Sequence, residues 1–391
     1  MALFSKFLTR YIAASLILAL VGSCAQSLPP PPVVVLLPSV GAVELLIANQ
    51  APLDSVQLEI GIQVFDNKLD NEDRERFEEW VYAEIRENEV KYLPYVLRNT
   101  LLEADHWGAV RVLPQPDPSV DIQVDGTVLH SDGERLEIAI LATDSSGRQW
   151  LNKTYADTTT LSDFPESTRF TTGSPFNPNG FIDPFQDLYD QIANDLLAAR
   201  ELMDSAELVN IKRVSQMVYA SDLSPETFAH TLTTGTEGLL TVTSLLAEAD
   251  PMLARVDDMR ERHLGFIDTV DEYYEALYTE MQASYVIWRR YSHDQIDETQ
   301  RLSTRLEDYD LNDYGTSRSF TSLTQRYDRY RWSKIYEQEF RELAAGFNRE
   351  LAPAILELSE QVNGVSGTMD EQYVQWRRIL QALFRLETEQ M

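Results

Sequence analysis

Histidine, cysteine and paired carboxylates are the side chains of this sequence that could support catalysis or bind a metal. The five histidines are scattered, with no pair at the spacing of metal ligands, and one cysteine allows neither a disulfide nor a cysteine-based zinc site. The sequence has no HExxH, GxSxG, P-loop or GxGxxG motif. Acid pairs such as Asp257-Asp258 could act in acid–base chemistry, but a chain with 63 acidic residues contains such pairs by chance. We therefore predict no catalytic residue, no metal site and no cofactor.

A repeated pattern of tyrosine, tryptophan and arginine is the second chemical feature. Residues 285–290 read YVIWRR, residues 373–378 read YVQWRR, and residues 327–332 (YDRYRW) form a weaker third copy. These residue types dominate binding hot spots. The candidate partner surface therefore consists of Tyr285, Trp288, Arg289, Tyr373, Trp376 and Arg377. The alternative, which we favour, is that the aromatic rings fill the core while the arginines pair with carboxylates.

The only cysteine, Cys24, ends an N-terminal segment with the features of a bacterial export signal. Lys6 and Arg10 precede an apolar stretch over residues 11–22 that is too short to span a membrane. The stretch ends in VGSC, residues 21–24, which resembles the lipobox of bacterial lipoproteins. That resemblance implies removal of residues 1–23 and diacylation (palmitate-type lipidation) of Cys24. The alternative is an ordinary cleaved signal with a chance cysteine.

The anchor and the overall charge limit the partners of the mature chain. Ala25 follows the cysteine, where an aspartate would favour retention at the inner membrane, so we expect the outer membrane, with the protein facing the periplasm. The formal charge of −30 disfavours nucleic-acid binding, which needs clustered Lys and Arg. The expected partners are the membrane, through the lipid anchor, and envelope proteins. The sequence does not fix the oligomeric state.

The elements after the anchor begin with a tether and a small α/β domain. Residues 24–40 form the lipid anchor and a proline-rich tether, and residues 41–157 the domain. Alternating apolar residues predict a strand over residues 56–64, and a period of three to four predicts helix over residues 71–106, divided or restarted at Pro94. The remaining strands are expected over residues 109–113, 121–129, 136–142 and 149–155, with turns at Ser131-Asp132-Gly133 and residues 144–147.

This order of elements is similar to a known periplasmic α/β domain. The matching residues are GAVRVLP at 108–114 and VDIQVDG at 120–126, followed by the hairpin through Asp132-Gly133. The domain resembles that of the curli-secretion lipoprotein, of the lipoprotein activators of penicillin-binding proteins, and of the N-terminal domain of the Tol-Pal propeller protein. The resemblance covers residues 55–156, and it implies a domain that docks on envelope partners or assembles, without catalysis.

The rest of the chain is predicted to be a helical bundle over residues 183–391, after a linker at residues 158–182 rich in proline and glycine. Helices are expected to begin at Asp183-Pro184, Ser224-Pro225 and Asp250-Pro251. The third is the longest, to about residue 305, with a break allowed near Ser292, and His263 lies on its apolar stripe as a packed core residue. A further helix is predicted over residues 319–362, and Thr368 with Glu371 forms a capping box for the last helix.

The predicted fold class is α+β, a small α/β sheet domain followed by an aromatic-rich bundle of long helices. The predicted function is that of a non-catalytic, outer-membrane-anchored periplasmic lipoprotein that docks on or scaffolds a cell-envelope assembly. The alternative is a periplasmic cell-wall hydrolase or lyase that uses carboxylates as acid and base.

Overall fold

The computed structural model describes residues 36–68, 83–164, 182–235, 238–243, 250–310 and 368–389, and the structural statements below concern these residues. The predicted signal peptide, Cys24, most of the proline-rich tether, the third aromatic segment at residues 327–332 and the helix expected over residues 319–362 lie outside them. By the contacts between its residues, the chain divides into residues 1–37 and residues 38–391. All helices and strands of the described residues belong to the second unit.

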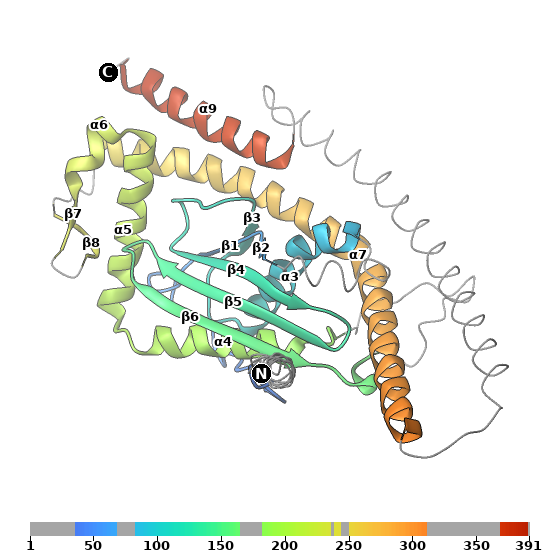
Figure 1. Ribbon diagram of the computed structural model, residues 1–391. Helices are drawn as coiled ribbons and strands as arrows, with labels where there is room; N and C mark the ends of the chain where they lie inside the picture. Colours follow the sequence, from blue (N-terminus) through green and yellow to red (C-terminus); the bar gives the residue numbers. More distant parts are fainter. Residues whose placement is uncertain are drawn as a thin grey trace, which may run out of the picture. The chain divides into compact units, whose positions relative to one another are not determined.

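A mixed sheet of six strands forms the centre of the fold (Figure 1). Strand β1 lies between β3 and β4 and runs parallel to both, and β4, β5 and β6 follow one another as an antiparallel meander. The short strand β2 pairs with β4. Burial alternates along β4 and β5 as the apolar residues do, because successive side chains of a strand point to opposite faces. The strands are β1 (Ile60–Gln63), β2 (Asp66–Asn67), β3 (Val110–Leu113), β4 (Ile122–Ser131), β5 (Arg135–Asp144) and β6 (Gln149–Thr158).

Helices surround this sheet, and a small hairpin stands apart from it (Figure 1). Helix α3 joins β1 to β3 and packs on both strands, while α4 packs on β6 and on α3. The hairpin of β7 (Leu232–Thr234) and β8 (Leu240–Val242) lies against α5. The helices are α3 (Ala83–Ala104), α4 (Gln186–Glu201), α5 (Ser205–Leu223), α6 (Pro225–Phe228), α7 (Pro251–Asp310) and α9 (Met369–Glu389).

Helix α3 continues through Pro94, so the prediction that this proline divides or restarts the helix is wrong. A proline inside a helix leaves the carbonyl four residues earlier without its usual N–H donor. In this structure that carbonyl belongs to Val90, and it accepts a hydrogen bond of 2.9 Å from the backbone N–H of Phe65 instead. The chain after β1 therefore supplies the bond that Pro94 removes.

The predicted helix starts are confirmed at three positions and corrected at a fourth. Helix α6 begins at Pro225, directly after Ser224. Asp250 accepts from the backbone N–H of Met252 at 2.8 Å, directly before α7. Before α9, the backbone N–H of Thr368 donates to the Glu371 carboxylate at 2.9 Å. The hydroxyl of Thr368 accepts from the backbone N–H of Glu371 at 3.3 Å. Helix α4 begins at Gln186 rather than at Pro184, because Asp183 accepts from the Phe185 N–H and closes a turn first.

Helix α7 is a single helix of 60 residues, without the break that we allowed near Ser292. At 1.5 Å per residue it is roughly 90 Å long. Its first half packs on β3 and α9, and it also contacts α3. The apolar stripe predicted for this helix is buried, as Val256, Phe266 and Tyr285 show.

The α+β class is confirmed, but the two predicted domains share one core. Apolar residues of the sheet cluster with side chains of α3, α4, α5 and α7, among them Ile138 on β5, Leu196 on α4 and Trp288 on α7. Strand β6 also runs to Thr158, into the predicted linker of residues 158–182. The division between residues 41–157 and 183–391 is therefore corrected: the apolar faces of α4 and α7 are buried against the sheet domain and not only against other helices.

Candidate functional site

Arg289 on α7 is fully buried and connects three elements. Its Nη2 donates to Glu89 Oε1 on α3 at 2.6 Å and to the hydroxyl of Ser131 at the end of β4 at 2.8 Å. Its Nη1 donates to the backbone carbonyl of Asp132 in the β4–β5 turn. The carboxylate of Glu89 also accepts from the Tyr285 hydroxyl at 2.8 Å. We name these residues, together with Asp183, the Arg289 cluster.

Aromatic rings enclose the guanidinium of Arg289. It lies 4.7 Å from the ring centre of Phe185, 5.0 Å from that of Tyr285 and 4.9 Å from that of Trp288. Stacking of this kind stabilises a guanidinium away from water. Burial by itself would lower the pKa of Arg289, but its interactions with Tyr285 and with the charge of Glu89 keep that pKa above its usual range. The arginine therefore stays charged inside the core.

Asp183 brings a second carboxylate to the Arg289 cluster. Its Oδ1 accepts from the backbone N–H of Phe185 at 2.9 Å, and its Oδ2 lies 3.5 Å from the Tyr92 hydroxyl. Burial raises the pKa of Asp183 to about 6, since the Phe185 amide and the charge of Arg289 offset the loss of solvent only in part. One guanidinium thus faces two buried carboxylates.

A second buried cluster centres on Asp117, in the loop between β3 and β4. Its Oδ2 accepts from His263 Nε2 on α7 at 2.8 Å and from the Tyr373 hydroxyl on α9 at 2.6 Å, and its Oδ1 accepts from the Ser119 N–H at 2.8 Å. Burial opposes ionisation of Asp117. The charge of His263 and the hydrogen bonds from His263, Ser119 and Tyr373 nevertheless hold the pKa of Asp117 well below its usual range. The predicted core position of His263 is confirmed, with 1% of its surface exposed.

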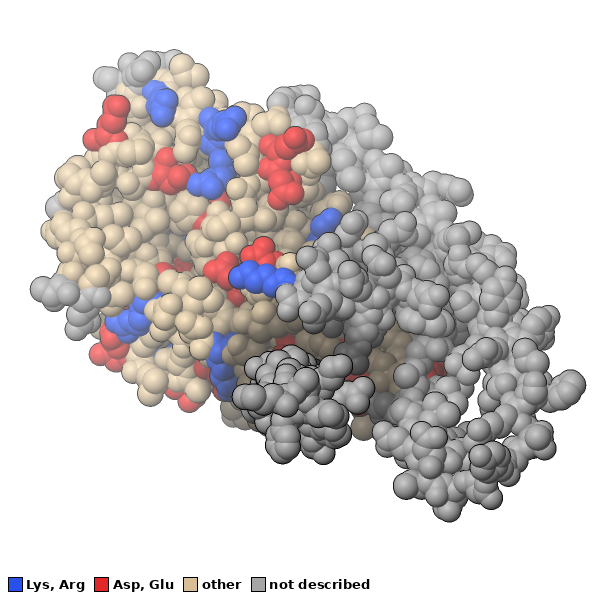
Figure 2. Space-filling view, in the orientation of Figure 1, with Lys and Arg blue, Asp and Glu red and all other residues tan. Residues whose placement is uncertain are grey.

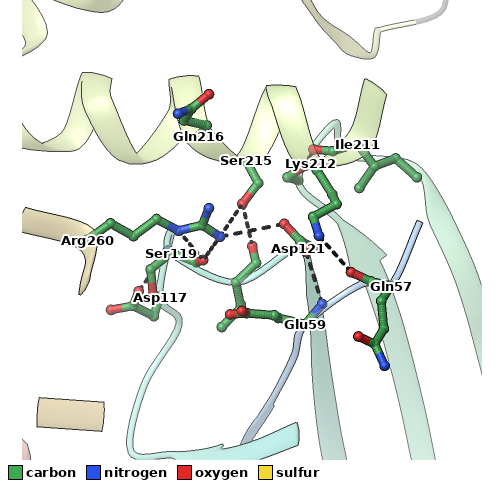
Figure 3. Close-up of polar contacts among 12 residues, drawn as sticks. Gln57, Glu59, Asp117, Ser119, Asp121, Ile211, Lys212, Ser215, Gln216 and Arg260 are labelled. Carbon is green, nitrogen blue, oxygen red and sulfur yellow. Dashed lines mark hydrogen bonds and ion pairs between the residues drawn. The ribbon is translucent and has the colours of Figure 1, made fainter. Parts of the chain in front are cut away.

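The same loop is fixed by α5 and α7 around Asp121 (Figure 3). Arg260 on α7 donates to the carbonyl of Ser119 at 2.5 Å and lies 3.7 Å from Asp121 Oδ1. Ser215 on α5 donates to the carbonyl of Val120 at 3.2 Å. Asp121 Oδ2 accepts from the N–H of Glu59, which precedes β1, at 2.9 Å. The loop is therefore the junction at which the sheet, α5, α7 and α9 meet.

The Asp117–His263 pair has the geometry in which a carboxylate orients an imidazole, as in nucleophile-activating pairs. In the described part of the chain, neither His263 Nδ1 nor the Ser119 hydroxyl has a hydrogen-bond partner. Asp117 and Ser119 have no exposed surface, and α7 and α9 cover them. In this conformation the pair joins helices to the loop, and a substrate could reach it only if those helices moved.

The candidate partner surface is not a surface in the described structure. Tyr285, Trp288, Arg289 and Tyr373 expose 3% of their area or less. The two segments also lie in different clusters, since Arg289 contacts Glu89 whereas Tyr373 contacts Asp117. The partner-surface interpretation is therefore corrected for these residues: helix periodicity aligns Tyr285 and Trp288 with the apolar stripe of α7 that faces the sheet.

Trp376 and Arg377 complete the second segment on α9. The ring of Trp376 is half-buried and stacks on Phe266 of α7, with ring centres 5.2 Å apart. Arg377 pairs with Asp222 at the end of α5 at 2.9 Å. The predicted pairing with carboxylates is thus confirmed for Arg377, as it is for Arg289.

Three of the buried acids, Glu89, Asp117 and Asp121, do not stand out in the sequence, and Asp183 stands out only as the expected start of a helix. Among more than sixty acidic residues, nothing in composition separates a buried carboxylate from a solvated one. A local signal exists at Asp117, which lies between two prolines and accepts from the N–H two residues later, the geometry of an Asx turn. Asp183, before Pro184, accepts from the Phe185 N–H in the same way. The partners of Asp117, namely His263 and Tyr373, are far away in the sequence.

No group of three or more His, Cys, Asp or Glu side chains in the described ranges could hold a metal ion. None of the helices in this part of the chain is both long enough and apolar enough to cross a membrane. On the face drawn in Figure 2, basic side chains lie among acidic ones and are separated by neutral surface.

Comparison with known proteins gives no family and a weak structural likeness. No family model matches this chain, and no curated protein matches it. Among solved structures, the chain is similar to a PelC dodecamer from Paraburkholderia phytofirmans, with 14% sequence identity and a TM-score of 0.22. That match covers 38% of this chain and 93% of the PelC chain.

Proposed function

We propose that this chain is an outer-membrane-anchored periplasmic lipoprotein without catalytic activity, which docks on or scaffolds a cell-envelope assembly. The observation that carries the proposal is Cys24, the only cysteine, placed directly after an apolar export segment in the sequence VGSC. Two or more buried acyl chains anchor a protein stably, at about 0.8 kcal/mol per CH₂ group. Such an anchor would hold the folded unit at the membrane surface.

The folded unit has the construction of a rigid platform. Arg289 joins α7 to α3 and to the β4–β5 turn, and Asp117 joins the β3–β4 loop to α7 and α9. Both clusters are buried, so each fixes the relative position of elements that are far apart in the sequence. A docking module needs this kind of preorganisation, because a surface that is already ordered loses less entropy on binding.

The resemblance of residues 55–156 to periplasmic docking domains of envelope lipoproteins supports the same proposal. The order β1, α3, β3 and the three-stranded meander is the order that this resemblance implied. We therefore place the docking function in the sheet domain and assign to α7 and α9 the role of supporting it.

The docking part of the proposal can be tested by co-isolation. The intact lipidated protein, carrying a C-terminal affinity tag, is recovered after crosslinking in living cells and gentle solubilisation of the envelope. We expect a defined envelope protein to be enriched with it at constant stoichiometry. Cys24→Ser, which should remain folded but unanchored, is the matched control and should recover less of that partner.

Turnover of purified peptidoglycan by the same preparation would contradict the proposal. So would recovery of the protein alone, with no enriched envelope protein, under crosslinking that captures a known complex in the same sample.

A further inference from the structure

Five exposed apolar side chains lie on residues 46–53 and at the ends of α3 and α4. Leu53 exposes 74% of its surface and Leu202 87%. We name this group the apolar rim, and its members are Leu46, Ile47, Leu53, Leu102 and Leu202. Exposed apolar clusters on a folded protein mark contact sites for other proteins or for membranes.

Hydrogen bonds hold the rim together in space. The backbone N–H of Leu46 donates to the Asn194 side chain on α4 at 2.9 Å, and the N–H of Ala48 donates to the carbonyl of Ala104 at the end of α3 at 2.9 Å. Arg200, near the end of α4, donates to the carbonyl of Val56 at 3.4 Å. The segment that carries Leu46, Ile47 and Leu53 is therefore tied to the ends of the two helices that carry Leu102 and Leu202.

The charges around the rim are mainly acidic. Five acids lie within three residues of a rim residue in sequence, namely Glu44, Asp54, Glu103, Asp105 and Glu201. The nearby Lys212 donates to the backbone carbonyls of Asp54 and Gln57, and Arg200 to that of Val56. An anionic surface would be repelled by this arrangement, whereas an apolar surface with zwitterionic headgroups would not.

The rim lies close to the anchor along the chain. Only residues 25–35 separate Cys24 from the first described residue. Fully extended, this segment spans at most about 40 Å. The described chain then follows α4, from Asp187, which accepts from the N–H of Val43, to Asn194, which accepts from the N–H of Leu46. The rim thus begins ten residues after the first described residue, and the anchor gives it a high effective concentration of lipid.

We propose that the apolar rim rests on the bilayer that carries the Cys24 anchor, and that its occupant is a zwitterionic phospholipid surface. The inference rests on the proposed function, because it needs the lipid anchor. It adds an orientation: the ends of α3 and α4 would face the membrane. Helix α9, which contacts the far end of α5, would face away from it.

The test uses the absence of any other cysteine. After lipidation of Cys24, a cysteine introduced at one position is the only reactive thiol. The variants are Leu53→Cys in the rim and, as the control, Leu386→Cys, an exposed leucine on α9. Lys212 of α5 contacts the rim segment and Asp222 contacts α9, so about half the length of α5, roughly 15 Å, separates these two contacts. Each is labelled with the fluorophore NBD, and the lipidated protein is reconstituted into vesicles of phosphatidylcholine and phosphatidylethanolamine.

Nitroxide-labelled phospholipids should quench the label at position 53 at least about twofold more than the label at position 386. Adding Ile47→Glu and Leu202→Glu to the Leu53→Cys protein should remove the difference, because charges at these exposed positions resist entry into lipid. Equal, weak quenching at both positions in protein that floats with the vesicles would overturn the inference and leave the anchor intact. Protein that does not float with the vesicles would overturn both the inference and the proposed function.

Discussion

At the scale of single residues, the structure explains why a chain with so many acids keeps several of them out of water. Glu89 and Asp117 each accept at least three hydrogen bonds, and each faces a side chain that can carry a positive charge. Buried ion pairs of this kind contribute little net stability compared with apolar residues, but loss of one partner is costly. Their effect here is to fix which elements meet.

The Arg289 cluster gives the first prediction. Replacement Arg289→Met keeps the apolar stem but leaves Glu89 and Asp183 buried without a counter-charge, so we expect a loss of about 3–5 kcal/mol in the free energy of unfolding. Arg301→Met, which removes an exposed pair with Asp297, is the control and should cost at most about 0.5 kcal/mol. Urea denaturation at pH 7 measures both, and equal small losses would contradict the account.

Asp183 gives a prediction about pH. Its pKa is raised in the folded state from 3.8 to about 6, so its contribution to stability is fully present below 3.8 and is lost as the pH rises through 6. Asp183→Asn should therefore unfold like the wild type near pH 4 and be more stable by about 1–3 kcal/mol at pH 7. Asp258→Asn, on the exposed side of α7, is the control. A constant difference from pH 4 to pH 7 would argue against the raised pKa.

At the scale of elements, the sequence predicts well those strands, turns and helix starts that local residue patterns determine. The meander β4–β5–β6 follows from alternating residues and from turns at Asp132-Gly133 and Gly147, which adopts a positive φ. The capping box of Thr368 follows from spacing alone. Pro94 could not be placed correctly, because the bond that compensates for it comes from Phe65, on another element.

Close packing of the β4–β5 turn on α7 gives a third prediction. A Cβ atom added to Gly133 would lie 2.6 Å from the carbonyl oxygen of Arg289, so Gly133→Ala must push the turn away from the helix. We expect a loss of about 1–3 kcal/mol, the usual cost of overpacking. Gly265→Ala, inside α7 with open space around it, should instead stabilise by about 0.5–1 kcal/mol. Thermal unfolding of both variants measures these changes. A change in stability of the same sign in both would be evidence against close packing of the β4–β5 turn on α7.

The tryptophans of the two repeated segments give a fourth prediction. Trp288 is 3% exposed and lies in the main core, so Trp288→Ala should cost about 3–5 kcal/mol. Trp376 is only partly buried, so its truncation should cost less than that of Trp288. Calorimetry of the purified variants measures this. A melting temperature that changes by less than about 2 °C in both variants would restore the partner-surface interpretation.

At the scale of the whole molecule, the sequence predicted the α+β class and missed how its halves combine. An apolar stripe shows that a helix is buried on one face but not which surface covers it, and the stripes of α4 and α7 are covered by the sheet. A repeated pattern likewise identifies Arg289, Tyr373 and Arg377 but not what they contact. Their partners Glu89, Asp117 and Asp222 were therefore not predicted.

A shared core predicts that the sheet domain cannot stand alone. A fragment of residues 38–164 lacks Leu196 and Trp288, which belong to the same apolar cluster as Ile138. Its sheet would then expose a face that the helices cover, so we expect no cooperative thermal transition and strong binding of a hydrophobic dye. The full mature chain is the control and should show a cooperative transition. A sharp unfolding transition of the fragment would support two independent domains after all.

The most direct test of the central claim, that this protein is an outer-membrane lipoprotein, is fractionation of cells that express the wild type or Cys24→Ser. We predict that the wild type incorporates labelled palmitate and remains in the outer-membrane fraction after a high-salt wash. The variant should lose both the label and its place in that fraction, because the sequence contains no second cysteine to acylate. A Cys24→Ser protein that stays in the washed outer-membrane fraction would contradict the account.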